Sequence, residues 1–204
     1  MACYIRPRMP GATVFFTVAL AKSGGSLLVN RVDVLREAVR QTQRARPFVI
    51  DAWVVLPDHL HAVWTLPDGD ADFSTRWGAI KARFSRGVGS TGGSMVGLKP
   101  TLQGAGRVGF KPTDVAEMRR ARSASKVAKA DAGIWQRRFW EHHIRDTADY
   151  EAHMRYCWLN PVKHGLAERP VDWPYSSIHR DIRKGRIEAD WSGPIPEGRF
   201  GENA

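Results

Sequence analysis

Cysteine is nearly absent from this chain of 204 residues, and long apolar runs are absent altogether. Cys3 and Cys157 are too few for a disulfide framework or for a metal site built on thiolates. No stretch approaches the roughly 20 consecutive apolar residues that a membrane-spanning helix needs. These absences favour a reducing compartment, and we expect a cytoplasmic protein with no membrane partner.

One apolar stretch near the N-terminus has two interpretations. The sequence TVFFTVALA follows Arg6 and Arg8, an arrangement that a short signal peptide would share. Its β-branched and aromatic side chains and the Lys-Ser-Gly-Gly turn after it favour a buried strand at about residues 13–20 instead.

Acidic side chains are also in deficit, with 21 Asp and Glu against 31 Lys and Arg and a net charge of +10. Such a charge favours a polyanionic partner, with nucleic acid as the first candidate and a membrane surface as the alternative. Residues 87–133 hold eight basic and three acidic side chains and nine of the 19 glycines. This segment has too little apolar surface to offset its ordering entropy. We therefore expect one domain over residues 1–204, with a flexible basic insertion at 87–133.

The apolar periodicity of the remaining chain predicts a mixed fold. In order, the predicted elements are a strand at 13–20, a helix at 29–46, strands at 48–57 and 59–66 in a hairpin, a helix at 73–86, a strand within 134–146 and a helix at 147–159. This order matches the split βαβ arrangement, a ferredoxin-like α+β fold with an antiparallel sheet and helices on one face. A last helix, which Pro161 should end, and an irregular tail would follow the sheet.

Histidine is scarce as well, yet two of the seven lie one residue apart in LPDHLHAVWTLP. In a strand, His59 and His61 share one face with Cβ atoms roughly 7 Å apart, while Leu60, Ala62 and Trp64 face the core. Their imidazoles can therefore converge on one metal ion. Two solvent-facing histidines without a ligand would give the same pattern, and the shortage of thiolates argues against structural zinc.

The predicted last helix, within TADYEAHMRYCWLN, carries a second group of polar side chains. Tyr156 and Asn160 are one turn apart, so a phenol and a carboxamide oxygen can address the same point. Alternatively, Tyr156 is a half-buried aromatic residue with a solvated hydroxyl, and Asn160 is a C-terminal cap.

Several motifs in one order point to a family. HLH at 59–61 and a downstream Tyr-x-x-x-Asn, YCWLN at 156–160, resemble the HUH single-strand transposases of the IS200/IS605 type, which use one catalytic tyrosine. The surrounding stretches are IDAWVVLPDHLHAVWTLP, WQRRFWEHHIRD, YCWLNPVKHG and WPYSSIHRD. They closely resemble the REP-associated tyrosine transposases, a domesticated bacterial branch. The resemblance runs from about residue 13 to 190, interrupted by the insertion.

This resemblance implies a DNA transposase that cleaves and rejoins single-stranded DNA beside short REP-like palindromic hairpins through a 5'-phosphotyrosine intermediate. Tyr156 on the last, catalytic helix would be the nucleophile, and His59, His61 and Asn160 would hold a divalent ion, Mg²⁺ or Mn²⁺. Basic side chains expected to contact the DNA are Arg6, Arg8, Arg137, Arg138 and Lys163. Relatives of the insertion-sequence type usually carry Gln where Asn160 stands, so the coordination of the metal ion can differ from theirs.

Other functions remain compatible with these residues. A domesticated hairpin-binding protein would keep the metal pocket without cleaving DNA. A metal-dependent nuclease with water as nucleophile would cut DNA without a protein-linked end. The same family resemblance is compatible with a monomer and with a homodimer.

Overall fold

A computed structural model describes residues 9–90 and 133–202 of the chain. The elements are β1 (Thr13–Ala19), α1 (Leu27–Asn30), α2 (Val32–Ala45), β2 (Val49–Val55), β3 (His59–Thr65), α3 (Phe73–Ser90), β4 (Trp140–His143), α6 (Thr147–Lys163), the 3-10 helix η1 (Pro170–Asp172) and α7 (Ile178–Arg183). Arg6, Arg8 and most of the expected insertion lie outside the described residues. No helix in the described ranges is long and apolar enough to cross a bilayer.

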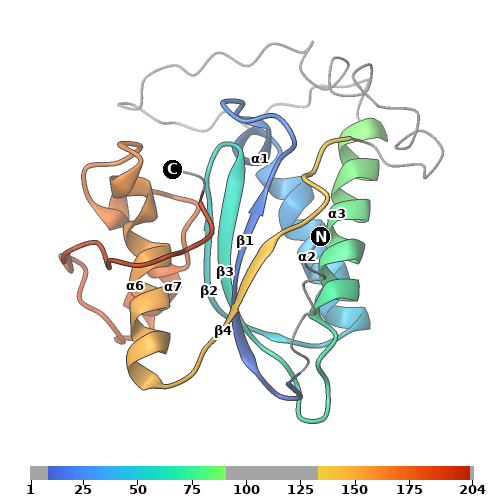
Figure 1. Cartoon of the computed structure of the whole chain (residues 1–204). Helices are drawn as coiled ribbons and strands as arrows, with labels where there is room; N and C mark the ends of the chain where they lie inside the picture. Colours follow the sequence, from blue (N-terminus) through green and yellow to red (C-terminus); the bar gives the residue numbers. More distant parts are fainter. Residues whose placement is uncertain (1–8, 91–132, 203–204) are drawn as a thin grey trace.

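The strands form one antiparallel sheet in the order β2-β3-β1-β4. Figure 1 shows α2 and α3 against one face of this sheet and α6 against the other. The predicted α+β fold with a four-stranded antiparallel sheet is confirmed. The register sets Thr17 opposite His61 and Ala19 opposite His59, so β1 lies directly beside the histidine strand.

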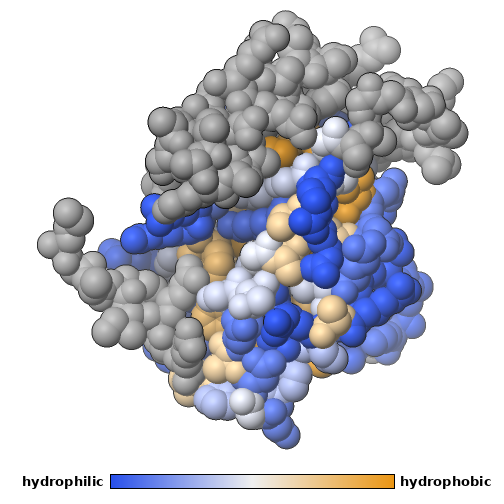
Figure 2. Space-filling view, turned by 90° about the vertical axis from the view of Figure 1, so that its right-hand side faces the viewer, coloured by the Kyte–Doolittle hydropathy of each residue, from blue (hydrophilic) through white to orange (hydrophobic). Residues whose placement is uncertain are grey.

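Each face of the sheet has its own core. Side chains of β1 and β3 that point to α2 and α3 include Phe16 and Trp64, and Trp64 stacks on Trp77 of α3 with ring centroids 4.2 Å apart. The opposite face carries Phe15 and Val63 and packs against α6 and the C-terminal segment. Seen from the α3 side, the described surface is largely hydrophilic, with hydrophobic residues in a narrower band (Figure 2).

Several predicted boundaries were wrong for local physical reasons. The helix expected at 29–46 is two helices, α1 and α2. The helix expected to end at residue 86 continues to Ser90, where Val88 is buried. A Cβ on Gly87 would lie 2.6 Å from a methyl of Val34, so the glycine allows α3 to approach α2 closely. The first four residues assigned to the insertion therefore belong to a packed helix.

Pro161 also failed to end α6, which runs to Lys163. Proline lacks an amide hydrogen and so removes one helical bond, but the next turn still closes, with His164 N donating to Asn160 O at 3.1 Å. The tail is less irregular than expected, because η1 and α7 form and Trp173, Ile178 and Phe200 are buried against α6 and the sheet. With these two corrections, Lys163, His164 and Glu202 lie beside the predicted histidine pair.

Candidate active site

The two strand histidines lie at the start of β3, just after the hairpin turn. Asp58 Oδ1 lies 2.8 Å from His59 Nδ1, and Thr17 Oγ1 on β1 lies 2.9 Å from His61 Nδ1. Each imidazole is thus held at Nδ1, as metal-ligating histidines commonly are, and presents Nε2 to the space between β3 and α6. His59 Nε2 is buried with no hydrogen-bond partner among the described residues.

The proton on His61 can be assigned from its neighbours. Thr17 Oγ1 donates its single hydrogen to the carbonyl of Phe200 at 2.5 Å, so it can only accept from His61 Nδ1. Burial lowers the pKa of His61 to about 4, which keeps the ring neutral at physiological pH. A lone pair therefore remains on Nε2, which is the form that binds a metal ion.

His59 has the opposite electrostatic environment. Burial alone would lower its pKa, but the hydrogen bond with Asp58 and the negative charges of Asp58 and Glu202 outweigh that effect and raise the pKa of His59 to about 8. A site rich in negative charge that favours a proton on His59 also favours a cation in the same place.

Helix α6 supplies the remaining predicted residues. Asp146 caps its N-terminus by accepting a hydrogen bond from Asp149 N at 2.8 Å. Tyr156 is 1% exposed, and its ring centroid lies 5.2 Å from that of His61. Lys163, two turns further on, donates from Nζ to Tyr156 Oη at 2.8 Å. The phenol therefore lies beside both an imidazole and an ammonium group.

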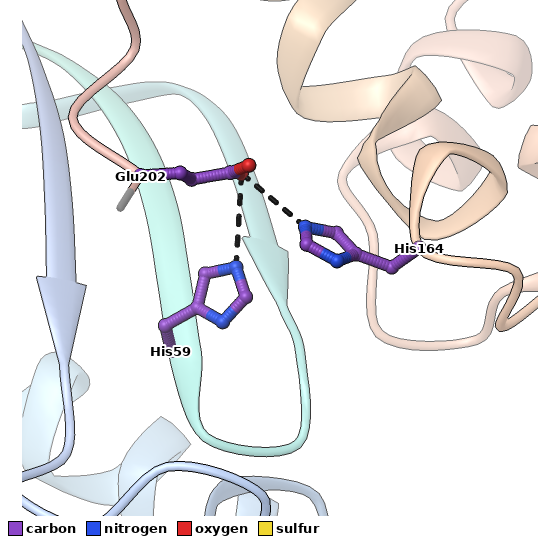
Figure 3. A group of neighbouring side chains, drawn as sticks. All are labelled: His59, His164 and Glu202. Atoms are coloured by element: carbon purple, nitrogen blue, oxygen red, sulfur yellow. Dashed lines mark hydrogen bonds and ion pairs between the residues drawn. The ribbon is translucent and has the colours of Figure 1, made fainter. Parts of the chain in front are cut away.

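Glu202 is a site residue that the sequence analysis missed. Its carboxylate lies between the histidine strand and α6, with Oε1 2.8 Å from His61 Nε2 and accepting from Asn160 Nδ2 at 2.8 Å. Figure 3 shows it facing His59 and His164, whose Nε2 atoms are 3.7 and 3.4 Å away. Nothing in the sequence links Glu202 to residues about 140 positions earlier. The sequence carried a weak signal for His164, because this residue follows Asn160 by four positions, about one helical turn.

The contact between His61 and Glu202 has a chemical consequence. Neutral His61 presents a lone pair at Nε2 toward a carboxylate oxygen only 2.8 Å away, and two acceptors at that distance repel each other. A cation or an additional proton relieves the repulsion. Asn160 Oδ1 is likewise buried without a hydrogen-bond partner among the described residues. A buried oxygen of this kind is suited to bind a cation.

The phenol of Tyr156 holds its proton firmly in this arrangement. Burial raises the pKa of Tyr156 well above its usual range, and the neighbouring Glu202 carboxylate raises it further. The ring of Phe200, two residues before Glu202, stacks on Tyr156 with centroids 3.7 Å apart. The C-terminal segment therefore covers the phenol and disfavours its ionisation.

Metal-ligating side chains gather in two groups among the described residues. His59, His164 and Glu202 form one group, in which the ligand atoms all lie within 4.8 Å of one another. His142, Asp149 and His153 form the other, between β4 and the first turns of α6. Burial would raise the pKa of Asp149, but hydrogen bonds from His142 and Arg145 outweigh it and lower that pKa to about 2. This second network attaches α6 to β4.

The structure brings together five of the nine residues singled out in the sequence. His59, His61, Tyr156, Asn160 and Lys163 surround one pocket. Arg137 and Arg138 are exposed on the segment before β4 and make no described contact with these five residues. Arg6 and Arg8 lie outside the described residues, so their role stays a prediction.

Comparison with known proteins agrees with this arrangement, although no family model matches the chain. The chain is 39% identical over 202 residues to a REP-associated tyrosine transposase of Escherichia coli K12, covering 99% of this chain and 98% of the relative. It is 34% identical over 193 residues to a putative REP-associated tyrosine transposase of Haemophilus influenzae, covering 95% and 94%. A solved structure of a REP-associated tyrosine transposase bound to a REP hairpin superposes with a TM-score of 0.77 at 39% identity. That match covers 100% of this chain and 99% of the solved one.

Proposed function

Because the chain belongs to the REP-associated tyrosine transposases, we propose that it cleaves and rejoins single-stranded DNA beside REP-like hairpins, with Tyr156 as the nucleophile. The observation that carries this proposal is the convergence of Tyr156 with His59, His61 and Asn160 on one pocket. A solved relative bound to a REP hairpin supports hairpin DNA as the partner. A DNA substrate on the chromosome is consistent with the expected cytoplasmic location.

The residues present fit a divalent metal ion. Within residues 9–90 and 133–202, His59 Nε2 and Asn160 Oδ1 are buried without hydrogen-bond partners, and His61 Nε2 carries a lone pair toward Glu202. We assign His59, His61 and Asn160 as ligands of Mg²⁺ or Mn²⁺, at the place where the Glu202 carboxylate now contacts His61 and Asn160. Bound there, the ion would polarise the scissile phosphate and neutralise part of its charge. Imidazole donors beside amide and carboxylate oxygens are compatible with Mn²⁺ in particular.

Lys163 is positioned to prepare the nucleophile. An ordinary phenol has a pKa near 10 and is a weak nucleophile at neutral pH. The Lys163 ammonium, 2.8 Å from Tyr156 Oη, stabilises the phenolate once the Glu202 carboxylate has left the pocket. This contact gives Lys163 a role in addition to the DNA binding expected from the sequence.

The reaction then exchanges one phosphodiester for another. Tyr156 Oη loses its proton and forms a bond to phosphorus, the bond from phosphorus to the 3' oxygen breaks, and that oxygen takes up a proton, so the number of protons is unchanged overall. The products are a 5'-phosphotyrosyl end and a free 3' hydroxyl, and attack by a 3' hydroxyl on the phosphotyrosine reverses the step. Because the bond energy is conserved, rejoining needs no nucleotide cofactor.

A covalent-adduct assay tests this function. The full chain is incubated with a 3'-labelled hairpin oligonucleotide and Mn²⁺, because the 3' fragment is the one that becomes attached to Tyr156, and the products are separated on a denaturing gel. We expect a protein-linked DNA species with the wild type, none with Tyr156→Phe, and a normal amount with Tyr150→Phe on the same helix. An adduct retained by Tyr156→Phe would rule out the assigned nucleophile.

The same gel, run beside a native gel that reports binding, separates the two alternative functions. Cut DNA without a protein-linked end would indicate water as the nucleophile. Specific hairpin binding with no cut product in Mg²⁺ or Mn²⁺ would indicate a binding protein that has lost cleavage. Arg6, Arg8, Arg137 and Arg138 remain proposed DNA contacts, and replacing each should reduce the salt dependence of binding.

A further inference from the structure

A cavity on the opposite side of the sheet from α6 has no part in the proposed strand transfer. It has a volume of about 340 Å³ and lies between α2, the edge strand β2 and residues 174–180. Its lining includes apolar side chains of α2 and β2, the two aromatic residues Trp53 and Tyr175, and three arginines, Arg36, Arg40 and Arg180. The volume is in the range of small-ligand sites.

The cavity is built by the WPYSS motif, whose role the active site leaves unexplained. Residues 175–177 extend along the outer edge of β2, where Val55 N donates to Tyr175 O at 2.9 Å and Ser177 N donates to Trp53 O at 2.7 Å. Ser177 Oγ also accepts from Trp53 N at 3.0 Å. These bonds satisfy the exposed strand edge and fix the Tyr175 backbone at the mouth of the cavity.

The aromatic residues are placed for stacking. Trp53 packs on Trp64 and Trp77 in the core with nearly parallel rings, yet it remains partly exposed where it lines the cavity. Tyr175 is also partly exposed, and the guanidinium carbon of Arg36 lies 6.0 Å from its ring centroid. A flat apolar ring inserted here would meet aromatic surface and a cation at once.

The arginines differ in their availability. Arg180 is committed to the fold, because it donates to the carbonyls of Ile50 and Asp51. Arg36 and Arg40 are exposed, and among the described residues their ion pairs are with acids three residues earlier on α2, Asp33 and Glu37. Such exposed pairs contribute little, so both guanidinium groups can turn to phosphate oxygens.

We propose that this cavity binds one unpaired nucleobase of the single-stranded DNA that flanks the hairpin. The base stacks at Tyr175 and Trp53, while Arg36 and Arg40 hold the adjoining phosphates. The cationic rim and the net charge of +10 favour a nucleotide over an apolar peptide. Val55, which lines the cavity, precedes His59 by four residues, so a strand leaving the active site can reach it around the hairpin turn. This inference rests on the proposed function and names a recognition element for its substrate.

Binding of two matched DNA probes to the full chain tests the proposal. One is a blunt hairpin and the other is the same hairpin with a four-thymidine unpaired flank, each measured by fluorescence anisotropy at one fixed salt concentration. We expect the wild type to bind the flanked probe more tightly. Tyr175→Ala should reduce affinity for the flanked probe about tenfold and leave the blunt hairpin unchanged, while Tyr175→Phe, which keeps the ring, should behave as wild type.

A charge control separates the cavity from general attraction to DNA. Arg36→Ala should weaken the flanked probe selectively, whereas Arg44→Ala, a basic residue on α2 outside the cavity, should affect both probes alike. The proposal is overturned if the wild type shows no preference for the flanked probe, or if Tyr175→Ala weakens both probes equally. A thermal melt of each variant identifies an effect due only to unfolding, in which case Tyr175→Phe and Arg36→Ala decide the outcome.

Photo-crosslinking locates the bound base. Together with the adduct assay, it distinguishes a failure of the base site from a failure of the proposed strand transfer. A flank carrying 4-thiothymidine should crosslink to the peptide that contains Tyr175 or to β2, and crosslinks found only elsewhere would refute the cavity. If the Tyr156 adduct forms while the flank preference is missing, strand transfer stands and the base site fails. If the wild type binds neither probe, both proposals fail.

Discussion

Removal of the Glu202 carboxylate should activate the enzyme. Oε1 of this side chain lies within 3.7 Å of the Nε2 atoms of His59 and His61 and of Asn160 Nδ2, and Oε2 accepts from Lys163. In the proposed function the scissile phosphate binds among these groups, so the Glu202 carboxylate competes with it, and this carboxylate also raises the pKa of Tyr156. Glu202→Ala removes both obstacles while leaving the stack of Phe200 on Tyr156.

The size of the effect follows from opposing terms. Each charge-assisted hydrogen bond contributes about 1.5–3 kcal/mol, and Glu202 receives two short ones, from Asn160 and Lys163, and a longer one from His164, at a carboxylate that is only 16% exposed. Ordering each tail residue costs about 1–2 kcal/mol, and three residues from Phe200 to Glu202 are held in place. These two terms are each about 3–6 kcal/mol and largely cancel. Because the tail covers the site in this structure, the net preference is about 0–3 kcal/mol, which corresponds to a rate increase of up to about 150-fold.

The assay is the initial rate of covalent adduct formation at a DNA concentration below saturation, with Mn²⁺ held constant. Glu197→Ala is the matched control, because Glu197 lies on the same tail but is exposed. An unchanged rate in Glu202→Ala would show that the carboxylate does not compete with the phosphate. A lower rate, with the fold intact, would show that Glu202 is a required metal ligand.

Four further predictions test individual parts of the structure. Gly201→Ala should raise the adduct rate in the same assay, because Gly201 has φ of 71° and a Cβ there would overlap Trp140, displacing the tail. Lys163→Met should lower the adduct rate about 10- to 100-fold and Lys163→Arg should restore part of it; equal rates in the two variants would exclude stabilisation of the phenolate by charge. Asp149, whose pKa is lowered to about 2, should stabilise the fold above about pH 4 and lose that contribution as pH falls toward 2. Urea unfolding should therefore show Asp149→Asn less stable by about 1–2 kcal/mol at pH 7, with the difference vanishing near pH 2. Trp64→Ala should cost about 3–5 kcal/mol of unfolding free energy, and a loss below 1 kcal/mol would contradict the stacked core seen around Trp77.

Local patterns predicted the sheet and the histidine pair well. Alternation in β3 fixes which side chains share a face, so His59 and His61 were expected on the face opposite Leu60 and Trp64. The same reasoning misjudged α6, because the rule that proline ends a helix weighs one missing hydrogen bond and omits the tertiary packing around it. Lys163 was therefore expected near the site as a DNA contact, and its bond to Tyr156 was not foreseen.

The sequence by itself determined the order of the elements, the antiparallel sheet, the family and the residue types that could bind a metal ion and attack phosphorus. These follow from periodicities and spacings within a few residues, which a linear pattern can carry. The tertiary structure alone decided that Thr17 sets the proton on His61, that the segment at 175–177 completes a cavity beside β2, and that Glu202 lies among the histidines. Such contacts join positions more than 40 residues apart, and packing free energy rather than local spacing selects them.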